Sequence, residues 1–93
     1  MKDIMIGRFA VSKAGRDTGN MYVVVDEKDG FLYLADGVFH TVKAPKKKNR
    51  KHTQMMNEVV QGSVPERLGK KETVFDHEIK YAIKIRRKEE GYV

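Results

Sequence analysis

The residues in this chain with the most distinctive chemistry are the cations of residues 43–52, here called the basic run, which include the segment PKKKNRKH. The basic run holds six lysines and arginines and no acidic residue. The whole chain has a net charge of +6, but residues 1–42 have a net charge of −1 and residues 53–93 a net charge of +1. Such a localised positive field implies a localised anionic partner, and nucleic acid is the commonest one in the cytosol.

Two interpretations of the basic run compete. A solvated loop between two strands would need no partner, whereas a phosphate-binding surface would give a log–log salt slope of roughly −4 if six cations contacted a single strand. A nuclear-localisation segment is a third interpretation, which we disfavour because strand-forming sequence follows directly. We expect RNA binding, because no nearby acid balances the charge. The predicted contacts are Lys43, Lys46, Lys47, Lys48, Asn49, Arg50, Lys51 and His52.

Catalytic and metal-binding patterns are missing from the sequence. It has no cysteine, and Gly15 and Gly19 lack the Gly-Lys-Ser/Thr ending of a phosphate-binding loop. Asp76 and Glu78 lie at a predicted helix start, where capping explains them. The histidines lack the close spacing of metal ligands: they are His40, His52 and His77. We therefore expect a protein without catalytic residues, metal or cofactor.

Composition indicates one small globular domain over residues 1–93. The chain is 40% hydrophobic and 34% charged, which leaves a small core. Its mean hydropathy is −0.61, and no run approaches the ~20 apolar residues of a membrane span. The N-terminus lacks the apolar segment of a signal peptide. We expect a cytoplasmic monomer.

The elements that must position the cations are short strands. Ile4–Ser12 and Met21–Asp26 are rich in apolar and β-branched residues, which predicts strands. Between them lies KAGRDTG, residues 13–19, here called the glycine loop. Lys51–Met56 is the candidate last strand, needed to cover the edge of the sheet. The basic run is therefore predicted to form a loop that leads into this strand.

The segment FLYLADGVFHTV, residues 31–42, predicts a hairpin. Asp36-Gly37 lies between two apolar segments, as in a two-residue type I′ turn. Because cross-strand partners share a face, this register places Leu32, Leu34 and Phe39 in the core. The same register directs Tyr33 and His40 toward solvent.

The last third of the chain predicts helix. Ser63-Val64-Pro65-Glu66 has a capping-box pattern, and Leu68-Gly69 ends this first turn. Thr73 offers a second cap, after which apolar residues at helical spacing predict an amphipathic helix over about 75–87: Phe75, Ile79, Ala82 and Ile83. The predicted fold is mainly β, a small antiparallel barrel of about five strands over residues 4–56 with a helical extension over 63–87.

Residues 6–37 resemble the KOW motif of RNA-binding proteins. The matching positions are Gly7-Arg8, Gly15 and Gly19, the apolar strand Tyr22–Val25, and Asp36-Gly37. The chain is similar to archaeal and eukaryotic large-subunit ribosomal proteins with an N-terminal KOW domain. It is more similar still to small stand-alone KOW proteins of Gram-positive bacteria, which have a Lys-rich stretch after the barrel and a short C-terminal helix. The resemblance covers about residues 4–56 and extends more loosely to the helix.

This resemblance implies an SH3-like barrel that binds structured RNA, ribosomal RNA in particular. Asn20 stands where many relatives have Lys or Arg, so Lys13 and Arg16 are the phosphate contacts expected from the glycine loop. The alternative is a protein–protein docking module of the translation or transcription machinery, in which the basic run would meet an acidic patch. The chain has no tryptophan, which disfavours recognition of proline-rich peptides.

Overall fold

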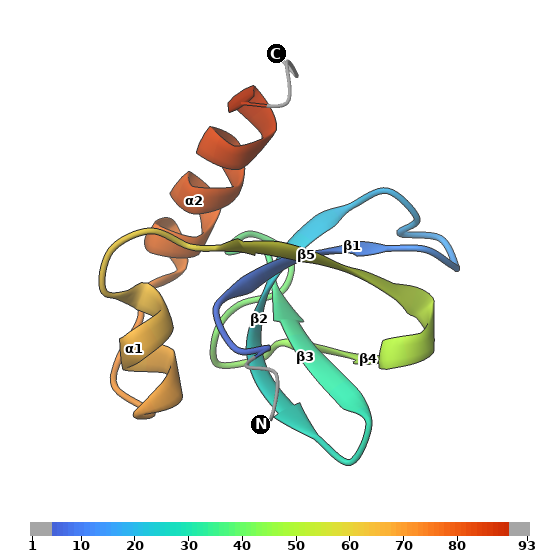
Figure 1. Cartoon of the computed structure of the whole chain (residues 1–93), viewed down its shortest axis with the longest axis horizontal. Coiled ribbons are helices and arrows are strands. Elements are labelled where there is room, and N and C mark those ends of the chain that lie inside the picture. The colour runs from blue at the N-terminus through green and yellow to red at the C-terminus, as the bar shows by residue number, and fades with distance from the viewer. Residues whose placement is uncertain (1–4, 90–93) are drawn as a thin grey trace.

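The computed structural model describes residues 5–89, and Figure 1 shows their arrangement. The chain forms five strands and three helical segments: β1 (Arg8–Ser12), β2 (Met21–Lys28), β3 (Phe31–Ala35), β4 (Lys46–Asn49), the 3₁₀ turn η1 (Arg50–His52), β5 (Thr53–Val59), α1 (Val64–Gly69) and α2 (Asp76–Glu89). The predicted class, mainly β with five antiparallel strands and a C-terminal helix, is confirmed. Within residues 5–89, no helix is long and apolar enough to cross a membrane.

The strands form one antiparallel sheet in the order β4-β3-β2-β1-β5. The chain leaves β4 through η1 and returns beside β1, so the first strand lies inside the sheet. β4 and β5 are its two edges. The predicted barrel is therefore not closed, a minor departure that arises because β5 pairs with β1 and not with β4.

The sheet is buried on both faces. Successive side chains of a strand point to opposite faces, and in β2 every residue from Met21 to Val25 is buried. One face carries a core cluster of Met5, Ala10, Tyr22, Val24, Leu32 and Leu34. The other face packs against the helical part of the chain, in a cluster of Phe9, Met21, Val23, Val25, Ala35, Val60, Val64, Leu68, Val74 and Ile79. Figure 1 shows α1 and α2 on the same side of the sheet.

Two predicted strands have different limits in the structure. β1 begins at Arg8, because Gly7 just before it has a φ of +89°; Ile4 lies outside the described residues. β5 begins at Thr53 and not at Lys51, because η1 occupies the preceding three residues. The sequence predicted the existence and order of both strands.

The predicted hairpin at Asp36-Gly37 is wrong. The Asp36 carboxylate accepts hydrogen bonds from the backbone N–H groups of Val38 (2.8 Å) and His40 (2.9 Å). These bonds close a local turn in place of a strand, and residues 36–45 form a loop. Phe39, predicted to lie in the core, is 86% exposed. His40 is half-buried, with its ring 6.0 Å from that of Tyr22.

The true partner of β3 is the basic run. Tyr33 is paired with Lys47, and the half-buried Tyr33 packs against the helical core cluster. The prediction of a loop across the whole basic run is therefore wrong, since residues 46–49 are a strand. Leu32 and Leu34 are fully buried, as predicted.

Gly37 connects loop 36–45 to the start of α2. It has a φ of +82°, and a Cβ at this position would lie 2.4 Å from the carbonyl oxygen of Asp76 and 2.9 Å from the amide nitrogen of Lys80. The backbone N–H of Val42 donates to the Asp76 carboxylate at 2.8 Å. Glycine is required here because the two backbones approach closely at positive φ.

Both helices lie close to their predicted limits, but their caps differ. Ser63 makes no side-chain capping bond; its hydroxyl accepts from Arg67 Nε at 3.1 Å. α2 begins at Asp76, three residues beyond the predicted cap Thr73. The Glu78 carboxylate accepts from the Phe75 N–H at 2.9 Å and is ion-paired with Arg67. This pair joins α1 to α2 and explains why Glu78 stands in the first turn.

Candidate nucleic-acid interface

Asp17 of the glycine loop connects the KOW-like part of the chain to the basic run. Its carboxylate accepts hydrogen bonds from the Ser12 hydroxyl and the Tyr22 phenol, both at 2.8 Å. The same carboxylate is ion-paired with Lys46 (2.9 Å) and Lys48 (3.1 Å) of β4. One buried carboxylate therefore holds two of the six cations of the basic run.

The register of β4 explains why these two lysines reach Asp17. Lys46 is paired with Leu34 and Lys48 with Leu32 on β3. Because cross-strand partners share a face, the lysine stems lie on the face of the first core cluster and their ammonium groups extend to its rim. There Lys48 Nζ also donates to the carbonyl oxygen of Ala14 at 2.9 Å.

The ionisation of this cluster is fixed near neutral pH. Burial raises the pKa of Asp17, but hydrogen bonds from Lys46, Ser12, Tyr22 and Lys48 outweigh it and hold that pKa well below its usual range. Burial and the hydrogen bond to Asp17 raise the pKa of Tyr22 to about 12. The carboxylate therefore stays charged and the phenol stays neutral.

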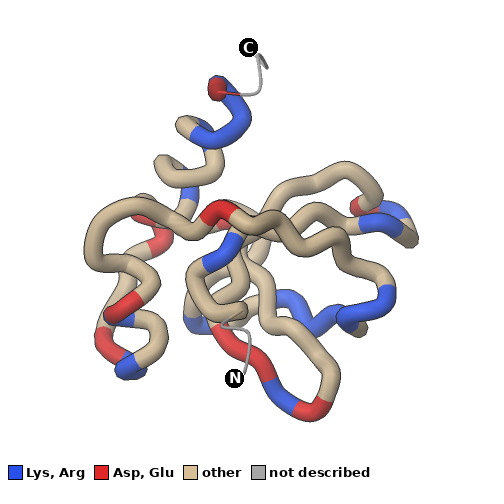
Figure 2. Tube along the Cα trace, viewed as in Figure 1, with Lys and Arg blue, Asp and Glu red and all other residues tan. Residues whose placement is uncertain are grey.

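Four of the predicted contacts are exposed cations at one end of the molecule. Lys13 and Arg16 lie in the glycine loop, and Arg50 and Lys51 lie in η1. The backbone N–H of Lys13 donates to the carbonyl oxygen of His52 at 2.8 Å, which brings the two segments together. Figure 2 shows both blue segments at the right of the view. Within residues 5–89, none of the four is in an ion pair.

The other predicted contacts have separate surroundings. Lys47 points to the opposite face of β4 from Lys46, with its Nζ 4.4 Å from the centroid of the Phe31 ring. The Asn49 side chain accepts from the Lys51 N–H at 2.9 Å and so caps η1. Lys43 is exposed in the loop before β4, and His52 is exposed at the end of η1.

Arg8, at the start of the KOW-like motif, has a structural role. Its Nε donates to the carbonyl oxygen of Met56 (2.7 Å) and its Nη2 to Asn57 Oδ1 (3.2 Å). These bonds fill the irregularity in the β1–β5 register that follows Arg8. The sequence left Arg8 open as a phosphate contact or a partner of an acid, and its contacts here are to a carbonyl and an amide.

A basic stripe on α2 was missed by the sequence analysis. It consists of Lys80, Lys84, Arg87 and Lys88. Its spacing of three, four and eight residues places these side chains on one side of the helix, and this periodicity could have identified it. Arg87 Nη2 donates to the carbonyl oxygen of Gly19 at 2.9 Å, so the last turn of α2 contacts the glycine loop.

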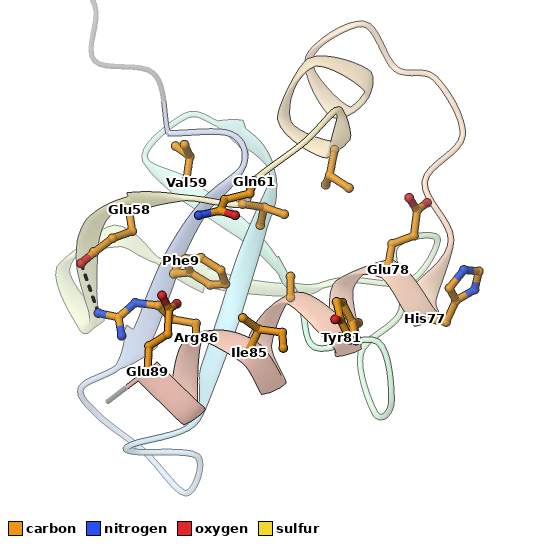
Figure 3. A pocket seen from close by; sticks show the side chains of 13 residues that line it. Phe9, Glu58, Val59, Gln61, His77, Glu78, Tyr81, Ile85, Arg86 and Glu89 are labelled. Atoms are coloured by element: carbon orange, nitrogen blue, oxygen red, sulfur yellow. Dashed lines mark hydrogen bonds and ion pairs between the residues drawn. The ribbon is translucent and has the colours of Figure 1, made fainter. Parts of the chain in front are cut away.

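The other side of α2 faces a groove of about 820 Å³, closed by the end of β5. Phe9 lies at its floor, and Tyr81 and Ile85 of α2 line it (Figure 3). Arg86 and Glu58 form an ion pair of 3.2 Å across one end. Within the described part of the chain, no three acidic, histidine or cysteine side chains are placed to hold a metal ion.

Comparisons with known proteins do not assign a family. A scan against protein-family models finds no match to the chain, and a search of curated proteins finds none either. The KOW resemblance therefore stays a prediction from the sequence. The function must be argued from the arrangement of the cations.

Proposed function

We propose that this protein is a non-catalytic, cytoplasmic RNA-binding domain of the KOW type, which binds structured RNA and in particular ribosomal RNA. The observation that carries the proposal is the adjacency of the glycine loop and η1, joined by the hydrogen bond between Lys13 and His52. Two segments far apart in the sequence thereby present exposed cations at one end of the molecule.

The contacts of Asp17 divide the cations into two groups with different roles. Lys46 and Lys48 are already compensated by that carboxylate, so binding a phosphate would require them to share or break these bonds. The exposed cations of the glycine loop and η1 can neutralise phosphates directly, with release of counterions. Arginine adds a planar fork suited to phosphate oxygens. We expect the second group to supply most of the affinity: Lys13, Arg16, Arg50 and Lys51.

Crosslinking in cells, followed by sequencing of the attached RNA, tests the proposal. The expected result is enrichment of ribosomal RNA segments, with crosslinked peptides from the glycine loop and η1. A variant with Lys13, Arg16, Arg50 and Lys51 changed to glutamine should lose this enrichment at equal expression. Recovery of no RNA above background, or equal recovery with the variant, would contradict the proposal.

A second candidate function is docking on a protein of the translation or transcription machinery. The groove beside α2 favours it, because Val59 is 49% exposed and Tyr81 is 66% exposed, and exposed apolar surface of this kind marks interaction sites. Affinity purification with and without ribonuclease separates the two functions. Partners that disappear after ribonuclease treatment indicate RNA-mediated association, and partners that persist indicate protein docking.

A further inference from the structure

The basic stripe of α2 is a regular feature of the helix surface. Lys80, Lys84 and Lys88 are all exposed and recur every four residues. At a rise of about 1.5 Å per residue, they span about 12 Å along the helix axis. The stripe lies on the opposite side of α2 from Tyr81 and Ile85, which line the groove. It is therefore separate from the apolar surface of the helix.

The stripe is continuous with the proposed RNA interface. Arg87 contacts the glycine loop through the carbonyl oxygen of Gly19, and the same loop contacts η1 through Lys13 and His52. The glycine loop therefore has η1 on one side and the last turn of α2 on the other. Together these three segments form a band of cations, here called the basic band.

Aromatic rings are scarce along the basic band. The exposed rings of Phe39 and Tyr81 lie in loop 36–45 and in the groove, and Phe75 is stacked on His77 with ring centroids 5.7 Å apart. In the described chain, His52 is the one exposed ring contributed by η1 or the glycine loop. The Phe31 ring, next to β4, is half-buried and has the Lys47 ammonium group on its face.

This composition bears on the form of RNA. Single strands are bound largely by stacking of bases on aromatic side chains, whereas double-helical RNA is recognised by its shape and by contacts to phosphates and 2′-hydroxyls. We propose that the basic band, including the last turns of α2, binds the sugar–phosphate backbone of double-helical RNA. This inference rests on the RNA binding proposed above.

The test compares two RNA forms and two pairs of lysines. The probes are a fluorescein-labelled RNA duplex of about 16 base pairs, a length that a small duplex-binding domain spans, and one of its single strands. Lys84→Gln/Lys88→Gln removes two charges of the stripe. Lys70→Gln/Lys71→Gln is the matched control, since both lysines are exposed at the end of α1, away from the band. Fluorescence anisotropy at several salt concentrations gives the affinity and its salt slope.

The inference predicts tighter binding of the duplex than of the single strand by the wild-type protein. At about 0.1 M salt, Lys84→Gln/Lys88→Gln should weaken duplex binding at least tenfold and lower the log–log salt slope by about two. The control should match wild type in both. Lys80→Gln/Lys84→Gln is a second, independent variant, and thermal unfolding monitored by circular dichroism checks that each variant is folded.

The outcomes separate this inference from the proposed function. If the wild-type protein binds the single strand more tightly, or the folded stripe variants bind the duplex like wild type, the inference is overturned while RNA binding stands. If the wild-type protein binds neither RNA, the proposed function itself fails, and the inference fails with it.

Discussion

Lys48 and Asp17 are 31 residues apart in sequence and ion-paired at 3.1 Å. The pair connects the edge strand β4 to the loop between β1 and β2, and Lys46 strengthens the connection at 2.9 Å. Through it, the most basic segment of the chain becomes part of the folded sheet. The charge that the sequence suggests is a binding surface therefore has two roles, one in stability and one in binding.

Replacing Asp17 by Asn should destabilise the fold. The carboxylate side chain is only 11% exposed and accepts from four donors, and its loss leaves two lysines without a counter-charge. We expect a loss of about 2 to 3 kcal/mol in the free energy of unfolding, measured by urea denaturation.

Asp29→Asn is the matched control for this substitution. Asp29 is exposed in the turn after β2, with a φ of 52°, a conformation that asparagine also tolerates. It should change the stability by less than about 0.5 kcal/mol. Equal effects of the two substitutions would show that the Asp17 pairs contribute nothing.

The same cluster predicts how stability depends on pH. The pKa of Asp17 is held below its unfolded value of about 3.9, so the ionised carboxylate stabilises the fold above that pH. This contribution is lost as the pH falls from about 4 through the folded pKa, with a slope of up to about 1.4 kcal/mol per pH unit. Urea denaturation at a series of pH values should show a steeper acid decline for wild type than for Asp17→Asn. Parallel curves below about pH 4 would assign the decline to other carboxyl groups.

Gly37→Ala should loosen the contact between loop 36–45 and α2. The added methyl group would lie 2.4 Å from the Asp76 carbonyl oxygen, and backbone atoms cannot yield as a flexible side chain can. Gly30→Ala is the control, because Gly30 has a φ of +81° but nothing within 4 Å of the added atom.

The two alanine variants therefore separate steric overlap from backbone strain. The control should lose about 1 kcal/mol, the cost of a left-handed conformation, and Gly37→Ala should lose about 2 kcal/mol more. Thermal unfolding monitored by circular dichroism measures both. If the losses were equal, the close approach of Gly37 to α2 would be without energetic consequence.

The parts of the fold that could be predicted from the sequence are those fixed by local pattern. The β-branched segment at Met21 and the helical spacing around Ile79 each define an element that the structure contains. The hairpin prediction failed because Asp36-Gly37 satisfies two kinds of turn. The Asp36 side chain closes a local turn with Val38 and His40, and no pattern in the apolar residues distinguishes this outcome.

The candidate site shows a similar limit. Lysines disfavour strand formation, so a strand at residues 46–49 contradicts local propensity; tertiary pairing with β3 and the Asp17 carboxylate overrides it. That pairing depends on residues 17 and 48 meeting in space, which no periodicity reports. The helical stripe of α2, in contrast, could have been identified from spacing alone.

The central claim is that the exposed cations of the glycine loop and η1 bind RNA, and the salt dependence of binding tests it most directly. Filter binding to ribosomal RNA fragments across a salt series compares wild type, the variant Lys13→Gln/Arg16→Gln/Arg50→Gln/Lys51→Gln, and the control Lys70→Gln/Lys71→Gln. We predict that the four substitutions lower the log–log salt slope by about three to four and that the control leaves it unchanged. Salt-independent binding by wild type, or an unchanged slope in the quadruple variant, would contradict the account.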